Sequence, residues 1–241
     1  MEIMNVIAQG MGVDQDRLTA IATNLANVRT PAYKREMING TGFEAQLDAL
    51  EQGETARAGG RAVSRADMRP GAVQYTGRPL DMALSGENAF LELSRDGATL
   101  YGRQGAMRVD SQGRLVNAGG DLVMGMGGEI RLASNAPRID AQGNVYDQGK
   151  FIDRLSLASF DAPQNLTRLG AGVYRAGQER AQPMREGGSS VLQGYLEGSN
   201  VDPAHEMAGL IEVMRHFESL QKTAQFVDDM TGRAVQKLGE I

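Results

Sequence analysis

The chain has 241 residues and a formal net charge of −5 at pH 7, and aromatic residues make up only 5% of it, with no tryptophan. An acidic chain gives no electrostatic footprint for nucleic acid, so no nucleic-acid partner is expected. The absence of cysteine excludes disulfides, thiolate metal sites and cysteine nucleophiles. No apolar run is long enough to predict a transmembrane helix, so direct membrane insertion is not expected. The N-terminus lacks the basic and apolar regions of a secretory signal peptide.

The first predicted element is a helix from about Ile3 to Val28. Its apolar residues recur at alternating spacings of three and four, which is the period of one helix face. Asp14 interrupts this seam, and Thr30-Pro31 ends the helix because proline disfavours helical backbone in the preceding residue. The seam residues are Met4, Ile7, Met11, Leu18, Ile21, Leu25 and Val28.

Residues 34–75 are predicted to be a connector with little core of its own. Phe43, Leu47 and Leu50 suggest one short helix within it, followed by a polar, glycine-containing stretch.

Residues 76–199 carry the pattern of an irregular all-β domain, a sandwich or a barrel. Alternating apolar residues are separated by turn pairs such as Asp96-Gly97 and Gln148-Gly149. The segment from Val109 to Leu115 is echoed thirty residues later from Ile139 to Val145. Each copy predicts a hairpin with glycine in its turn. Two copies are too few for a solenoid.

The last predicted element is a helix from Pro203 to Leu238. Asp202 can cap it, and Pro203 suits the first helical position because its missing N–H has no partner there. The helix is too long for a small domain to cover, so one face is expected to meet other chains. Its seam is predicted to change register after Phe217, and it comprises Met207, Leu210, Met214 and Phe217, then Leu220, Ala224, Val227, Thr231, Ala234 and Leu238.

These elements predict an α+β fold. The two terminal helices, in residues 1–33 and 200–241, would pair as a coiled-coil-like domain, with the all-β domain inserted between them. Most seam residues of both helices, together with Asn24 and Asn27, form the predicted assembly interface. They are Met4, Ile7, Met11, Leu18, Ile21, Asn24, Leu25, Asn27, Val28, Met207, Leu210, Met214, Phe217, Ala224, Val227 and Leu238.

No catalytic, cofactor-binding or metal-binding residues are predicted. The stretch from Gly143 to Lys150 has the wrong spacing for a phosphate loop and no hydroxyl after the lysine. The only histidines, His205 and His216, are eleven residues apart, which is wider than the usual spacing of helical metal ligands. Sequence alone cannot pair any of the many carboxylates as a catalytic acid and base. The chain is therefore not expected to be an enzyme.

Three segments resemble the flagellar rod and hook proteins of bacteria. The first is Asn24-Leu25-Ala26-Asn27 with Thr30, Pro31, Tyr33 and Lys34, which departs from the family signature at Thr23 and at Ala32. Glycine is usual at position 32, so alanine there argues against a positive φ. The second segment is Glu197-Gly-Ser-Asn200 with the helix that follows, and the third runs from Asp67 to Leu84.

The resemblance implies a structural subunit of the flagellar rod, most like the proximal-rod member, with the distal-rod member as the alternative. It also implies export without a cleaved signal by the flagellar type III apparatus, and assembly in the periplasm with other rod subunits. The terminal helices would line the inner tube, and the β domain would form the outer layer. Two other classes stay open, namely a β-domain peptidoglycan hydrolase and an adaptor or chaperone-like module.

Overall fold

The computed structural model describes residues 2–39, 63–86, 88–170, 172–177, 179–184 and 190–239. The fold is α+β, and the chain divides into two compact units. The helical unit contains Met1–Ala26, Glu36–Arg65 and Asp202–Ile241, and the β unit contains Asn27–Arg35 and Ala66–Val201. The short helix expected around residues 43–50 lies outside the described residues.

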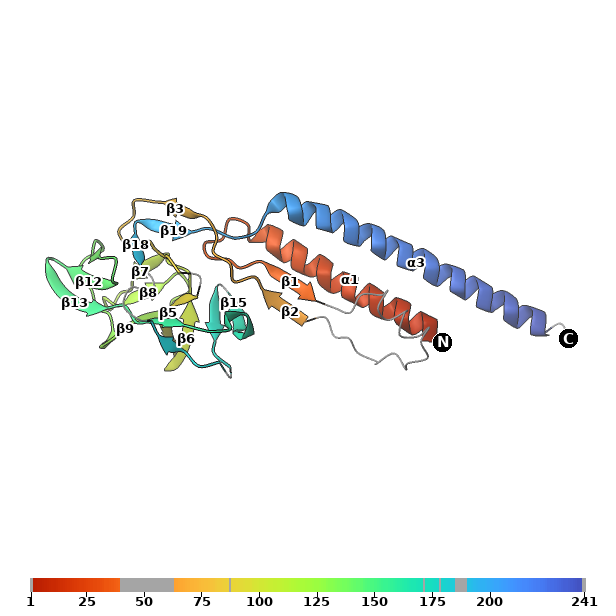
Figure 1. Cartoon of the computed structure of the whole chain (residues 1–241), viewed down its shortest axis with the longest axis horizontal. Coiled ribbons are helices and arrows are strands. Elements are labelled where there is room, and N and C mark those ends of the chain that lie inside the picture. Colours follow the sequence, from red (N-terminus) through yellow and green to blue (C-terminus); the bar gives the residue numbers. More distant parts are fainter. Residues whose placement is uncertain are drawn as a thin grey trace. The chain divides into compact units, whose positions relative to one another are not determined.

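Two helices dominate the helical unit (Figure 1). Helix α1 spans Glu2–Ala26, and helix α3 spans Pro203–Gly239 and contacts α1. Strand β1 (Glu36–Asn39) also contacts α1 and pairs with strand β2 (Val63–Ala66). Both helices were predicted, although α1 ends two residues before Val28.

The start of α3 has the cap that its sequence predicts. The Asp202 carboxylate accepts a hydrogen bond from the backbone N–H of Ala204 at 2.9 Å, and the Asp202 carbonyl accepts one from the N–H of Glu206 at 3.0 Å. Glu206 adds negative charge to the first turn, which the helix dipole favours. Asp202 therefore satisfies N–H groups that the helix itself leaves without partners.

The strands of the β unit are short and pair antiparallel throughout the described residues. Its largest sheet has the order β15-β16-β6-β5-β9-β8-β7, with β10 beside β9, β14 beside β5 and β17 beside β14. Smaller sheets are β11-β12-β13, β18-β4 and β19-β3. The strands are β3 Val73–Tyr75, β4 Met82–Leu84, β5 Ala89–Arg95, β6 Ala98–Gly102, β7 Met107–Val109, β8 Leu115–Asn117, β9 Leu122–Gly125, β10 Gly128–Glu129, β11 Arg138–Ile139, β12 Asn144–Asp147, β13 Lys150–Arg154, β14 Leu157–Ser159, β15 Thr167–Gly170, β16 Val173–Arg175, β17 Gln182–Pro183, β18 Val191–Gln193 and β19 Tyr195–Glu197, with a 3₁₀ turn at Pro163–Asn165.

The echoed segments form two equivalent hairpins, as predicted. In the first, Val109 pairs with Leu115, and in the second, Ile139 pairs with Val145. The carboxylate of Asp110 accepts the N–H groups of Gln112 and Arg114, and Asp140 repeats the pattern at Gln142 and Asn144. Gly113 and Gly143 have φ values of 78° and 82°, which glycine adopts without steric cost.

The core of the β unit has two clusters of buried side chains. The larger is aliphatic and is drawn from strands of several sheets, including Leu91 of β5, Leu115 of β8 and Val145 of β12. The smaller is aromatic, with edge-to-face contacts of Phe160 with Phe90 and with Tyr101. Aliphatic side chains and a few aromatic residues thus fill a core that has no tryptophan.

Candidate functional site: the signature junction and the terminal helices

The first and second signature segments meet inside the β unit. The residues that meet are close in sequence to those that connect the β unit to the helices. The N–H of Ala32 donates to the carbonyl of Glu197 at 2.8 Å, and the N–H of Asn200 donates to the carbonyl of Tyr33 at 3.3 Å. Segments more than 160 residues apart in the chain are thereby joined by backbone hydrogen bonds. We call this region the signature junction, made of residues 30–35, 67–71 and 197–200.

Ala32 corrects one expectation from the sequence. It has a φ of 54°, in the left-handed region, although alanine in place of the usual glycine argued against a positive φ. The residue is 1% exposed, and its N–H is used in the junction. The junction holds Ala32 in a conformation that costs an L-residue about 1–2 kcal/mol, so contacts around the turn outweigh that cost.

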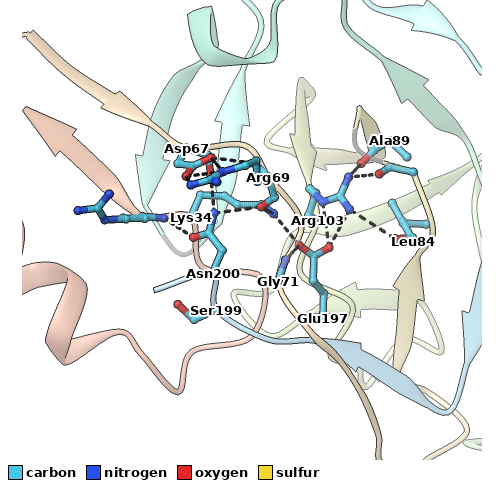
Figure 2. Close-up of polar contacts among 12 residues, drawn as sticks. Lys34, Asp67, Arg69, Gly71, Leu84, Ala89, Arg103, Glu197, Ser199 and Asn200 are labelled. Carbon is cyan, nitrogen blue, oxygen red and sulfur yellow. Dashed lines mark hydrogen bonds and ion pairs between the residues drawn. The ribbon is translucent and has the colours of Figure 1, made fainter. Parts of the chain in front are cut away.

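A buried charge network forms the centre of the junction (Figure 2). The ammonium of Lys34 donates to Oε1 of Glu197 at 2.5 Å and to the carbonyl of Arg69 at 2.8 Å. The guanidinium of Arg103 donates two bonds to Oε2 of Glu197, at 3.0 and 2.8 Å. The N–H of Gly71 supplies a further bond to Oε1 at 3.1 Å. One buried carboxylate therefore holds two cations and a backbone amide.

Arg103 also anchors the chain around β4 and β5. Its Nη1 donates to the carbonyls of Gly86 and Ala89, both at 2.7 Å, and its Nη2 lies 3.4 Å from the carbonyl of Leu84. The side chain is fully buried. The guanidinium therefore links the Glu197 carboxylate to the backbone around β4 and β5.

Burial and charge act against each other in this network. Burial of Glu197 works to raise its pKa, but Arg103 and Lys34 outweigh burial, and the pKa of Glu197 lies below its usual range. For Lys34, burial is the larger effect and lowers the pKa despite the attraction of Glu197. We take Arg103 as the main stabilising cation, because its charge is the largest effect that lowers the pKa of Glu197 and it makes two hydrogen bonds to the carboxylate where Lys34 makes one.

Asn200 fastens a second part of the junction through its amide. Its Oδ1 accepts the N–H of Arg35 at 2.7 Å, and its Nδ2 donates to the carbonyls of Asp67 and Arg69 at 2.8 and 3.0 Å. The Arg69 guanidinium pairs with the Asp67 carboxylate, and this hydrogen bond holds the pKa of Asp67 below its usual range. An amide is suited to this place because it both donates and accepts.

In the helical unit, the signature residue Asn24 joins three elements. Its Nδ2 donates to the carbonyl of Glu36 at 2.9 Å and to the Glu206 carboxylate at 3.2 Å, and its Oδ1 accepts the N–H of Glu36 at 2.8 Å. Asn24 and Glu206 are each 1% exposed. Asn24 of α1 thus binds both β1 and α3.

Asp14, which interrupts the predicted seam, has a partner on the other helix. Its Oδ2 lies 2.6 Å from Nδ1 of His216, and its Oδ1 lies 3.7 Å from Arg17. The Asp14 side chain is 2% exposed, and that of His216 is 45% exposed. The seam therefore carries one buried carboxylate that reaches a histidine at its edge.

The most buried positions of both helices lie one residue from much of the predicted seam. On α1 they include Val6, Val13 and Ala20, and on α3 they include Val213, whereas the buried Leu220 belongs to the predicted seam. On α3, Leu210, Val213, Phe217, Leu220, Ala224 and Val227 follow one another at alternating spacings of three and four and are all at least partly buried. The predicted register change is therefore wrong: the seam runs continuously through Val213, not Met214.

The predicted interface residues have different exposures. Ile7 and Asn24 are buried, whereas Met4, Met207 and Met214 are exposed. The structure does not describe the Leu238 side chain. The partly buried residues are Met11, Leu18, Ile21, Leu25, Asn27, Val28, Leu210, Phe217, Ala224 and Val227. Asn27 and Val28 belong to the β unit.

Three large apolar residues of α3 that the sequence interpretation did not include are also exposed. They are Ile211, Phe226 and Met230. Ile211 lies between Met207 and Met214 at helical spacing, so the three share one face. That spacing was visible in the sequence. We call Met207, Ile211 and Met214 the outer apolar face.

The described residues contain no group of three or more acidic, histidine or cysteine side chains arranged to hold a metal ion. Within the same residues, no helix is both long and apolar enough to cross a membrane.

The third signature segment lies along β3 and β4. Asp81 of its Arg-Pro-Leu-Asp run is fully buried, with Arg78 Nε 3.6 Å from its carboxylate. Among the described residues, neither carboxylate oxygen of Asp81 accepts a hydrogen bond.

Comparison with known proteins connects these features to a family. Residues 192–237 match the family model described as "Flagellar basal body rod FlgEFG protein C-terminal". The chain is 32% identical to the flagellar basal-body rod protein FlgF of Salmonella typhimurium, over 96% of this chain and 95% of that protein. The FlgF of Escherichia coli gives the same values. The FlgG of Agrobacterium fabrum is 30% identical over 95% of this chain and 97% of that protein.

These relatives match nearly the whole chain. The chain therefore belongs to the family of flagellar basal-body rod proteins and is a structural subunit of the periplasmic rod of the flagellar basal body.

Proposed function

We propose that the chain is a subunit of the proximal rod. The run from Arg78 to Asp81 and the His216-Phe217-Glu218 sequence of α3 favour this assignment. A position in the distal rod is the alternative, because FlgG relatives match nearly as well as FlgF relatives. We take the FlgF protein as the proximal-rod member and the FlgG protein as the distal-rod member, so expression of the chain in strains lacking either protein separates the two. Restored motility only in the strain without FlgF supports the proposal, and rescue only of the strain without FlgG contradicts it.

The subunit assembles through its helices. In this proposal α1 and α3 pair as a coiled coil, and neighbouring rod subunits pack against the outer apolar face. The observation that carries this proposal is the exposure of Met207, Ile211 and Met214, at 56%, 54% and 49%. Apolar side chains that share one exposed face are typical of a protein interaction site. Methionine suits contacts with several different neighbours because its side chain is flexible and polarisable.

The proposed interface also includes the seam residues of both helices. In the assembled rod, residues 1–33 and 200–241 would form the inner layer, residues 34–75 the connector and residues 76–199 the outer layer. The division of the chain at residues 26 and 202 supports a separate helical layer.

The subunit would reach the rod through the flagellar type III export apparatus, without membrane insertion and without a cleaved signal. Secretion of the full chain in cells with and without a working export apparatus tests this step. We further propose that the chain has no enzymatic activity. A zymogram with peptidoglycan tests this statement, and a cleared band from the purified chain would contradict it.

A single substitution tests the assembly surface. Met214→Asp places a charge on the outer apolar face, so it should prevent incorporation into isolated basal bodies. The matched control is Ser219→Asp, which adds the same charge at an exposed position on a different face of α3. The near-ultraviolet circular dichroism of the buried tyrosines should be unchanged in both variants. Incorporation of Met214→Asp at the level of the parent would contradict the proposed surface.

A further inference from the structure

Three contacts define how α1 and α3 are aligned. Asn24 binds Glu206 at 3.2 Å, and Asp14 binds His216 at 2.6 Å. Ile21 Cδ1 lies 3.7 Å from where a Cβ on Gly209 would stand. From Asn24 to Asp14 the chain goes back ten residues while α3 advances ten from Glu206 to His216. The helices are therefore antiparallel and keep one register over these contacts.

At this register the two buried seams match position by position. Val13 lies opposite Phe217, and Ala20 lies opposite Leu210, since each is displaced equally along both helices from the observed contacts. If one helix slides by seven residues, Ala20 moves opposite Phe217, or Val13 moves opposite Leu210. Apolar residues face apolar residues in all of these arrangements. The apolar seams therefore do not select the register.

The Asp14–His216 pair does distinguish these registers. A slide of seven residues would bring Asp14 opposite Gly209 or Thr223 and His216 opposite Ile7 or Ile21. Neither Gly209 nor Thr223 is basic, and Lys222, beside Thr223, lies on the exposed side of α3. Arg17 stays near Asp14 in every register because both lie on α1, so it does not discriminate.

We propose that the Asp14–His216 pair is a register determinant of the helix pair, in addition to the Asn24–Glu206 contact. The pair acts by making slipped alignments unfavourable, since a buried carboxylate that loses its partner is strongly destabilising. A single buried polar pair fixes register and partner choice in coiled coils for the same reason. This role accounts for a carboxylate in an otherwise apolar seam, and it does not depend on which part of the rod the chain occupies.

Cysteine cross-linking of the full chain tests the inference, because the native chain has no cysteine. Ala20→Cys with Leu210→Cys reports the native register. Ala20→Cys with Phe217→Cys, and Val13→Cys with Leu210→Cys, report slips of seven residues in the two directions. Disulfide yield under a mild oxidant is compared among the three pairs. In the parent chain only the native pair should cross-link, and failure of that pair to cross-link would overturn the proposal.

Each cysteine pair is then combined with changes at the polar pair. Asp14→Leu with His216→Leu removes the discrimination that this pair supplies and leaves only that of the Asn24–Glu206 contact, so the yield of slipped relative to native cross-links should rise at least about tenfold. Asp14→Asn with His216→Gln retains a hydrogen bond and should keep the native register. The matched control is Gln15→Leu with Arg215→Leu, two exposed neighbours on the same helices, and it should behave as the parent.

Cross-linking separates register from stability, because a leucine pair can leave the helices as stable as in the parent or more so. If the leucine variant cross-links only in the native register, the proposal is overturned. If that variant loses its helical circular dichroism, Asp14→Ala with His216→Ala is measured in its place. Retention of the native register alone in that variant likewise overturns the proposal.

Discussion

Replacing Arg103 with methionine should be among the most destabilising single changes in the β unit. The substitution keeps much of the side chain's length but removes the two bonds to Glu197 and the bonds to the carbonyls of Gly86 and Ala89. Glu197 stays buried, with only Lys34 and the Gly71 amide as its remaining partners in this network. Removal of one member of a buried ion pair costs about 3–5 kcal/mol. For a protein of this size the melting temperature should fall by roughly 10 °C.

The matched control is Arg95→Met. Arg95 also makes two bonds to a carboxylate, that of Asp121, at 2.6 and 3.0 Å. Its side chain is 46% exposed, so the loss should be only about 0–1 kcal/mol. Lys34→Met should fall between the two variants, because burial already lowers the pKa of Lys34 and offsets its attraction to Glu197.

Urea unfolding followed by near-ultraviolet circular dichroism measures these differences. The signal reports on the β unit because its buried tyrosines, Tyr33, Tyr101 and Tyr174, all belong to that unit. Equal losses for Arg103→Met and Arg95→Met would refute the argument from burial. A larger loss for Lys34→Met than for Arg103→Met would refute the assignment of Arg103 as the stabilising cation.

Two further predictions concern glycines and pH. Gly105→Ala should unfold or severely destabilise the β unit, because the added Cβ would lie 1.6 Å from the Met82 carbonyl oxygen. Gly12→Ala should instead stabilise α1 by about 1 kcal/mol, because an added Cβ there meets nothing within 4 Å. Thermal melts in which both variants change stability in the same direction would contradict this. Glu197 has a lowered pKa, so its contribution to stability should be complete above its unfolded value of about 4.5 and should be lost as the pH falls through the lower folded value. Urea midpoints measured between pH 7 and 3 should show that fall, and Glu197→Gln should show less of it; an equally steep fall in the variant would exclude Glu197 as its source.

The sequence predicted the elements better than their contacts. Asp202 and Pro203 placed the start of α3 at the correct residue because capping is a local property. The turns at Gly113 and Gly143 were also predicted correctly, because a turn depends on the residues within it. The observed buried face of the helices lies beside the predicted seam, because periodicity alone does not choose between neighbouring stripes of residues on a helix. The periodicity placed Met207 and Met214 in the seam, while Val213, one position before Met214, is the buried residue.

The signature junction could not be assembled from sequence. Nothing in the composition around Arg103 indicates a fully buried guanidinium, because its partner Glu197 is 94 residues away. Lys34 and Asn200 were named from the family signatures, but their joint role depends on a fold that brings residues 34, 67–71 and 197–200 together. The positive φ of Ala32 could not be predicted from its residue type either, since long-range hydrogen bonds hold it in a backbone conformation that its side chain disfavours.

The backbone bonds between Ala32 and Glu197 and between Tyr33 and Asn200 also have a consequence for folding order. Asn24 and Glu206 are separated by 182 residues, so their meeting in an unfolded chain closes a very long loop. Once the β unit has formed, its hydrogen bonds reduce the effective loop to about fifteen residues, which lowers the entropic cost of helix pairing by about 2 kcal/mol. We therefore expect the two terminal helices to pair last, after the β unit has folded, and their pairing to begin at the Asn24–Glu206 end.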